Sequence, residues 1–335
     1  MQKAPRISVC IPVYDTEPYL AQCLRSLYSQ DFDGFEVLVL SDRSPGKDEK
    51  GRSAKRIVKA AQKECDRYRK SRGLSPVPFR FFEHRENRGC VEVRRSLVYE
   101  AKGKFLAMLD SDDELMEGAL TSLYGVALSY EADIVHGTFI SGHYDGEGLF
   151  HESLQTKCGK IYYGTKEGLE IAKGWFSGLY NGNLCGKLIS REVYEKAFSE
   201  IPYTECNMAD DLLIFFFAGM SAHRYVGIEN KVYRYRINSG MSSQRLIDTL
   251  KKWQMICTSA SVFAIISQWV KEKGDFISPE DRKHLGLVTL GYLESAVHQL
   301  HDSVLPELQE KARAMLDDAW GQDFVNNVWN AIYKK

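Results

Sequence analysis

This sequence has no closely spaced pair of cysteines and no long apolar run, and each absence argues against particular classes of protein. The eight cysteines are scattered without CxxC spacing, which argues against a zinc site or a disulfide framework and predicts reduced thiols. The N-terminus lacks the apolar segment and cleavage site of a signal peptide. The most apolar long window, Trp253–Val270, contains two Gln, three Ser and one Thr, so it predicts a buried helix rather than a membrane span. We therefore expect a cytoplasmic protein, with the cytoplasmic face of a membrane as an alternative location.

An excess of charge of either sign is missing as well. The chain carries 44 Lys and Arg against 45 Asp and Glu, a net charge of −1. This balance argues against nucleic acid as the main partner. The length of 335 residues, 44% of them apolar, suits a soluble protein with one large domain and an appendage.

Strand and helix patterns alternate along the first 140 residues. Continuous apolar strands separated by helices predict an α/β fold with a mostly parallel sheet covered on both faces. The predicted strands are Ile7–Tyr14, Phe35–Asp42, Phe79–His84, Lys104–Asp110 and Ala132–Phe139, and the predicted helices between and after them include Val91–Ala101 and Glu117–Tyr130.

The second half of the chain is less regular and then becomes helical. Lys160–Gly164 predicts a short strand, Leu212–Met220 a helix and Arg224–Gly240 a strand pair. From about residue 243 the pattern is helical, over Leu246–Glu272, Glu280–His301, Pro306–Trp320 and Asp323–Tyr333. We therefore predict two parts, residues 1–243 and a helical region 244–335, in which packing on the first part, dimerisation and acceptor recruitment are all open.

The stretch FLAMLDSDDEL places carboxylates where an apolar strand ends. Two carboxylates at i and i+2, Asp110 and Asp112, can hold a hard divalent cation that leaves sites open for diphosphate oxygens. Helix capping is the alternative, and it explains Asp113 and Glu114 better than Asp110, which still belongs to the strand. An EF-hand is excluded because Leu115 stands where that loop needs glycine.

Other polar groups follow neighbouring strands at the same predicted edge. Asp15, Thr16 and Glu17 follow the first strand and Asp42 ends the second, and ligands of such sheets bind beyond the carboxyl ends of the strands. Arg88 and Arg94 lie on the turn and helix start of ENRGCVEVRR. Their guanidinium groups suit a diphosphate, although arginines on helix surfaces are usually only solvated.

Taken together, these blocks resemble the family 2 glycosyltransferases. The resemblance rests on SVCIPVYDTEPYLAQCLRSLYSQ, EVLVLSDRS, ENRGCVEVRRS and GKFLAMLDSDDEL, with CGKLISREVY, ADDLLIFF and YRYRINSGMSS later in the chain. It covers about Arg6 to Ser243. It implies a Rossmann-like GT-A fold, a DxD metal site and inverting transfer of a sugar from a nucleotide-diphosphosugar, most often a UDP-sugar.

The resemblance also implies residue roles. Asp211, the second acid of ADD, matches the catalytic base, and Asp112 matches the ligand of Mn²⁺ or Mg²⁺. The donor would be bound near the ends of the strands by Pro12, Val13, Tyr14, Glu17, Asp42, Arg88, Arg94, Asp110 and Ser111, with Asp42 on the nucleobase and Asp110 near the ribose. Further candidates are Asp210, Asp113, Arg236 and Ser242.

Four departures from the family pattern affect donor recognition rather than catalysis. Gly46 stands near the place of a second Asp, Arg43 replaces a small residue, Arg95 stands where Asn is usual, and the common Glu-Asp pair is Asp210-Asp211. The metal and base carboxylates are retained, so the sequence predicts an active enzyme.

The expected partners are the donor and a glycan, lipid-linked or protein acceptor. Residues 47–72 hold 11 Lys or Arg against 4 Asp or Glu, which fits a solvated helix face or contact with anionic lipid headgroups. Residues 244–335 offer a homodimer surface. Two alternatives are a non-catalytic glycan- or lipid-binding protein on the same fold and a sugar nucleotidyltransferase; the latter should carry a Gly-rich phosphate loop with Lys, which IPVYDTE lacks.

Overall fold

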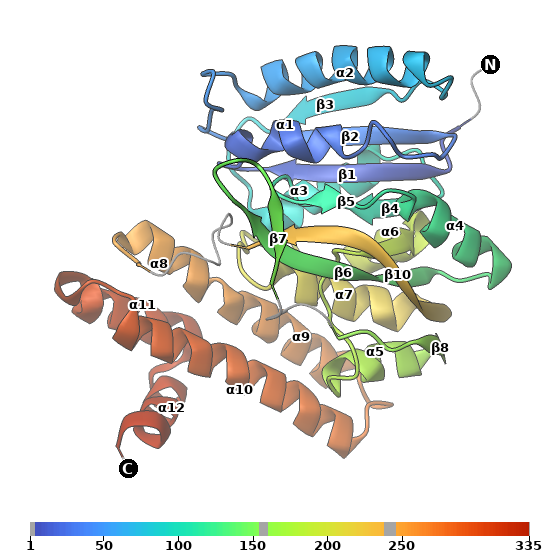
Figure 1. Ribbon diagram of the computed structural model, residues 1–335. Coiled ribbons are helices and arrows are strands. Elements are labelled where there is room, and N and C mark those ends of the chain that lie inside the picture. The colour runs from blue at the N-terminus through green and yellow to red at the C-terminus, as the bar shows by residue number, and fades with distance from the viewer. Residues whose placement is uncertain (1–3, 154–159, 238–245, 335) are drawn as a thin grey trace.

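A single mixed sheet with helices on both faces forms the body of the protein (Figure 1). The computed structural model describes residues 4–153, 160–237 and 246–334. Within these ranges the strands are β1 Ile7–Val13, β2 Phe35–Ser41, β3 Phe79–Glu83, β4 Phe105–Met108, β5 Glu114–Leu115, β6 Ile134–Tyr144, β7 Phe150–Glu152, β8 Gly164–Glu167, β9 Lys187–Ser190 and β10 Arg224–Arg236.

The strand order is β3-β2-β1-β4-β9-β6-β10-β5, with β7 beside β6 and β8 beside β10. The strands β3, β2, β1 and β4 are parallel, as is the pair β6 and β10. β9 runs antiparallel between β4 and β6. In register, Val13 lies opposite Ser41 and Cys10 opposite Met108, so the carboxyl ends of β1, β2 and β4 meet at one edge.

Alternation along the strands divides the core into two halves. Phe105 and Ala107 of β4 face one half, whereas Leu106 and Met108 face the other, as the two-residue period of a strand requires. Because both faces are apolar, helices must cover both. The helices are α1 Glu17–Arg25, α2 Ala54–Ser71, α3 Cys90–Glu100, α4 Ala119–Ser129, α5 Leu169–Phe176, α6 Arg191–Glu200, α7 Asp210–Ser221, α8 Leu250–Cys257, α9 Ser259–Lys273, α10 Pro279–Asp302, α11 Gln309–Trp320 and α12 Gln322–Tyr333, with a 3-10 turn, η2, at Pro306–Leu308.

α1, α2 and α4 contribute to the core half that holds Phe105, and α3, α5, α6, α7 and α9 contribute to the other. The helices α8, α10, α11 and α12 build a separate apolar cluster around Trp253, whose indole N–H donates to the Ala312 carbonyl (2.7 Å). α9 therefore joins the sheet's core, while the other C-terminal helices pack mainly on one another. In the described part of the chain, no helix is long and apolar enough to cross a membrane.

Three expected elements differ from the structure. Residues 160–163 are not a strand, and β8 begins at Gly164. The predicted strand pair after Arg224 is one long strand, β10, whose pairing with β6 shifts register between Gly227 and Tyr233. The predicted helix Leu246–Glu272 is divided, because α8 ends at Cys257 and α9 starts at Ser259.

Glu131 is in a left-handed conformation (φ 50°) just past the end of α4. The amide of Ala132 donates to the Ala127 carbonyl (2.9 Å), which is the pairing of a Schellman motif, and glycine is the residue favoured at that position. We predict that Glu131→Gly raises the free energy of unfolding by about 0.5–1 kcal/mol, because it removes the steric cost of a Cβ there. Urea denaturation measures this. Glu131→Ala is the matched control, and an equal gain with alanine would contradict the backbone explanation.

Candidate active site

Arg94, buried on α3, is the cation around which the carboxylates of the sheet edge gather. Its guanidinium lies 3.0 Å from Asp110 at the end of β4, 2.8 Å from Asp210 and 3.3 Å from Asp211 at the start of α7. Burial alone would lower the pKa of Arg94, but these three carboxylates raise it well above its ordinary value. Three segments distant in sequence are thus joined by one permanent positive charge.

Asp211 is a carboxyl group whose pKa lies near neutral pH. Burial raises its pKa to about 7, assisted by Asp210 and Asp110 and opposed by Arg94. Its Oδ1 atom is buried and, in the described part of the structure, makes the ion pair with Arg94 but no hydrogen bond. A carboxylate held in this way can accept a proton near neutral pH.

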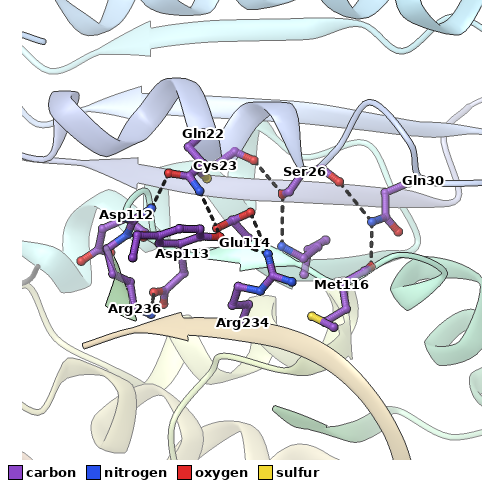
Figure 2. Close-up of polar contacts among 12 residues, drawn as sticks. Gln22, Cys23, Ser26, Gln30, Asp112, Asp113, Glu114, Met116, Arg234 and Arg236 are labelled. Atoms are coloured by element: carbon purple, nitrogen blue, oxygen red, sulfur yellow. Dashed lines mark hydrogen bonds and ion pairs between the residues drawn. The ribbon is translucent and has the colours of Figure 1, made fainter. Parts of the chain in front are cut away.

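The turn after β4 is held by a second polar network, shown in Figure 2. Glu114 accepts hydrogen bonds from Gln22, Tyr144 and Arg234. Asp113 is buried and accepts from the Tyr233 hydroxyl (2.8 Å). Burial, then the charges of Asp112 and Asp110, raise the pKa of Asp113 well above its usual range.

Arg236 fastens the same turn from the end of β10. Its amide donates to Asp113 (2.7 Å), and its guanidinium donates to the Asp112 carbonyl (3.0 Å) and to Gln22 (2.6 Å). The guanidinium also lies over the rings of Tyr19 and Tyr144, at 4.9 and 4.4 Å from their centroids. Through these contacts, Arg236 holds the turn Asp110–Asp113 (DSDD) against α1.

Asp42 is buried and engaged with a neighbouring loop. Its carboxylate accepts hydrogen bonds from the amides of Arg88 and Gly89, and one oxygen lies 2.7 Å from His84 Nδ1. Gly89 is the N-cap of α3, so Asp42 places a negative charge at the positive end of that helix. The Arg88 side chain itself is exposed.

The end of β1 contributes further groups to the edge. Val13 is buried, and Pro12 and Tyr14 are partly exposed. Glu17 is buried beneath Gly46, and its Oε2 atom has no hydrogen-bond partner among the described residues. Ser111 shares a hydrogen bond of 2.6 Å with the Thr16 hydroxyl.

Backbone strain is concentrated at this edge. Three of the four described non-glycine residues with positive φ are Asp15, Arg43 and Ala209, and they follow β1, follow β2 and precede Asp210. Such conformations persist where the surrounding structure fixes them, which is common at functional sites.

Comparison with known proteins identifies the family. The family model described as "Glycosyl transferase family 2" matches residues 8–198, more than half of the chain. The chain belongs to glycosyltransferase family 2.

Similar proteins agree with this assignment. The GalNAc(5)-diNAcBac-PP-undecaprenol beta-1,3-glucosyltransferase of Campylobacter jejuni is 27% identical over 159 residues, 46% of this chain and 46% of that protein. Two other curated relatives are covered over 64% and 32% of their length, so this chain spans less than two thirds of them.

Two solved structures share the fold. Staphylococcus aureus TarS 1-349 in complex with UDP-GlcNAc has a TM-score of 0.54 and 17% identity, over 98% of this chain and 92% of that one. The Pyrobaculum calidifontis mannosyltransferase PcManGT, in complex with GDP-Man and Mn²⁺, has a TM-score of 0.50 and 14% identity, over 100% and 89%. The GT-A fold expected from the sequence is confirmed.

Carboxylate oxygens that could hold a hard divalent cation gather at this edge. Asp110, Asp113 and Cys185 each place one ligand atom within 4.8 Å of the others. Burial raises the pKa of the Cys185 thiol well above its ordinary value, so the thiol keeps its proton and donates to Asp110 (3.2 Å). Oxygen donors of this kind suit Mn²⁺ or Mg²⁺.

The structure thus brings some predicted residues together and not others. Arg94, Asp110, Asp210 and Asp211 share one ion-pair network, and Asp112, Asp113 and Arg236 share the DSDD turn. Asp42 contacts the loop that carries Arg88, while Ser242 lies outside the described residues.

Five residues that sequence reasoning did not single out contact predicted site residues: Cys185, Tyr233, Gln22, Tyr144 and His84. Of these only His84 carried a usable signal, since it ends a predicted strand at the ligand-binding edge.

We predict that Arg94→Met lowers the free energy of unfolding by about 3–5 kcal/mol, because it leaves clustered, partly buried carboxylates without their cation. Urea denaturation measures the change. The control is Lys196→Met, which breaks an exposed pair with Glu192 on α6 and should change stability by less than about 1 kcal/mol. A similar loss in both variants would contradict the special role of Arg94.

Proposed function

We propose that this glycosyltransferase moves a sugar from a nucleotide-diphosphosugar, with UDP as the nucleotide, to a hydroxyl group of a glycan, a lipid-linked saccharide or a protein, with inversion at the anomeric carbon. The observation that carries the proposal is the ion-pair network in which Arg94 joins Asp110 to Asp211. The UDP-GlcNAc complex of TarS and the undecaprenol-linked substrate in the name of the Campylobacter relative support this choice of donor and acceptor.

The donor would lie across the carboxyl ends of β1, β2 and β4. We assign its binding to the ends of these strands and the Arg88 loop, that is, to Pro12, Val13, Tyr14, Glu17, Asp42, Arg88, Asp110 and Ser111. The buried, unpaired Oε2 atom of Glu17 supports a polar ligand contact there. Arg94, which already pairs with three carboxylates, would act on the donor through Asp110 rather than by touching the diphosphate.

Asp112 would hold Mn²⁺ or Mg²⁺. When bound, the cation would stabilise the diphosphate as a leaving group. The protein's own contribution is to hold the turn: Asp113, Glu114 and Arg236 are tied to β10 and α1, so the Asp112 backbone is fixed before any ligand arrives.

Asp211 would be the general base. The acceptor hydroxyl attacks the anomeric carbon opposite the leaving diphosphate, so its proton must pass to a carboxylate on that face. The ion pairs of Arg94 with Asp110 and Asp211 fix the two carboxylates relative to each other. A pKa of about 7 gives Asp211 the driving force of a base that still releases the proton afterwards.

Three wider assignments belong to the same proposal. The boundary between a catalytic part, residues 1–243, and a helical part, residues 244–335, follows the change of pattern in the sequence. Residues 244–335 would form a homodimer contact. The enzyme would be cytoplasmic, with peripheral attachment to the cytoplasmic membrane face through residues 47–72.

Asp211→Asn is predicted to reduce kcat by about 10²–10⁴-fold, because the amide cannot take the acceptor proton. Binding of the donor nucleotide should be unchanged. In the wild type, kcat/KM for the acceptor should rise with pH through about 7, since the deprotonated carboxylate is the active form. Steady-state transfer assays across pH measure both quantities, and full activity in Asp211→Asn would favour a non-catalytic role for this site.

A thermal-shift panel identifies the donor. With Mn²⁺, UDP or a UDP-sugar should raise stability by about 2.7 kcal/mol at 100 times its dissociation constant, whereas GDP-, CMP- and dTDP-sugars should not. We expect Asp112→Ala to lose this shift, and Asp133→Ala, at the far end of β6, serves as the control outside the site. A shift that is independent of metal, or a preference for another nucleotide, would contradict the proposed donor chemistry.

A further inference from the structure

The outer face of α2 carries a row of cations that we call the α2 stripe. Its members are Lys55, Arg56, Lys59, Lys63, Arg67 and Lys70, all exposed. At 3.6 residues per turn, they fall within about a third of the helix circumference, together with one acid, Asp66. The opposite face is buried on the sheet through Ala54, Ile57, Val58, Ala61 and Cys65.

The fold makes little use of these six charges: Arg67 donates to the Lys63 carbonyl (3.3 Å), and Lys70 lies in the last turn of α2, where a cation favours the helix. Among the described residues, none of the six makes an ion pair, and Asp66 accepts a hydrogen bond from Gln62. The cation that α2 does use for folding is Arg69, which is buried, donates to the carbonyls of Tyr28, Gln30 and Ser75, and lies over the Phe35 ring.

Four members of the stripe repel one another along the helix. Lys55, Lys59, Lys63 and Arg67 follow one another at four-residue spacing, so each is a neighbour of the next on the helix surface, and like charges at this spacing destabilise a helix. A row of mutually repelling charges that the fold does not neutralise is best explained by an anionic partner outside the chain.

The position of the stripe suits a flat partner. α2 forms the outer edge of the molecule beside β3, on the side opposite α10, α11 and α12 (Figure 1). Its N-terminus follows the loop that leaves the ligand-binding end of β2, where Arg43, Lys47 and Lys50 are also exposed. The positive surface therefore extends from the donor edge along the whole of α2.

We propose that the α2 stripe docks the enzyme on a membrane surface rich in anionic phospholipid headgroups. Four of its six members are lysines, which are compact point charges that attract a headgroup layer without bidentate geometry. The stripe contains no aromatic side chain on which a base could stack, and the net charge of −1 is unfavourable for nucleic acid. The inference rests on the proposed function, which includes peripheral attachment through residues 47–72, and it names the side chains and the headgroup chemistry that would bring the site to a lipid-linked acceptor.

Vesicle sedimentation tests this docking with the full chain. The probes are vesicles of equal parts phosphatidylglycerol and phosphatidylcholine, and vesicles of phosphatidylcholine alone. The wild type should sediment with the anionic vesicles and be released at about 0.5 M NaCl, where screening is strong. Each cation near the surface strengthens binding about fivefold, so Lys55→Glu/Lys59→Glu/Lys63→Glu should reduce partitioning at least about a hundredfold.

Two further variants separate local from global effects. Lys251→Glu/Lys283→Glu/Lys311→Glu makes the same net change on exposed lysines of α8, α10 and α11 and should keep wild-type partitioning. Lys55→Arg/Lys59→Arg/Lys63→Arg should bind as the wild type does. Thermal unfolding of each variant verifies that it is folded.

Several results would overturn the proposal. These are unchanged partitioning of the Lys55→Glu/Lys59→Glu/Lys63→Glu variant, an equal loss in the α8, α10 and α11 control, or equal binding to phosphatidylcholine alone. Stripe-dependent binding to an RNA homopolymer without vesicle binding would assign the surface to nucleic acid instead. The UDP and Mn²⁺ thermal shift, measured on the same proteins, reports the donor site separately, so failure of one proposal is distinguishable from failure of the other.

Discussion

The ion pairs of Arg94 are the constraint on which the site depends. Its buried guanidinium is shared by Asp110, Asp210 and Asp211, which approach from the end of β4 and the start of α7. Without a cation between them, these carboxyl groups would repel one another in a poorly hydrated edge. Because a guanidinium presents several fixed donors, a single side chain can orient all three. The ion pairs therefore add to the apolar packing that holds α7 against the sheet.

The position of Arg94 depends in turn on Asp42. That carboxylate accepts from the amides of Arg88 and Gly89, and so anchors the first turn of the helix that carries Arg94. Gly89 has φ 86°, and a Cβ there would lie 3.0 Å from the carbonyl oxygen of Cys206, in the loop before α7. This loop can therefore approach the start of α3 so closely only because residue 89 is a glycine. Asp42 thus links the end of β2 to the start of α3, the helix that carries Arg94.

The fold was predictable where the pattern was local. The apolar runs of β1 to β4 and the helices between them follow from periodicity alone. The single strand β10 does not follow from periodicity, since residues 227–230 (GIEN) are typical of a turn. Gly227 is needed there for a different reason: a Cβ would fall inside contact distance of the Tyr162 backbone, and the ladder continues through a register shift.

The gathering of acidic groups at one sheet edge was also predictable, because parallel strands end together. The side chains that contact these acidic groups could not be predicted. Nothing near Arg94 in sequence distinguishes a guanidinium that meets a diphosphate from one that meets Asp110, and nothing near Tyr233 or Cys185 indicates a contact with the DSDD turn.

The balance of charge at the edge explains why the acidic stretch is tolerated. Six carboxyl groups lie there, Asp110, Asp112, Asp113, Glu114, Asp210 and Asp211. Arg94 and Arg234 form ion pairs with four of them, and Arg236 holds the turn through its own amide and the Asp112 carbonyl. Two of the acids, Asp113 and Asp211, have raised pKa values and so hold part of the excess as protons. The remaining negative potential favours cations at this edge. The internal arginines therefore reduce the repulsion among these acids and offset part of their negative charge.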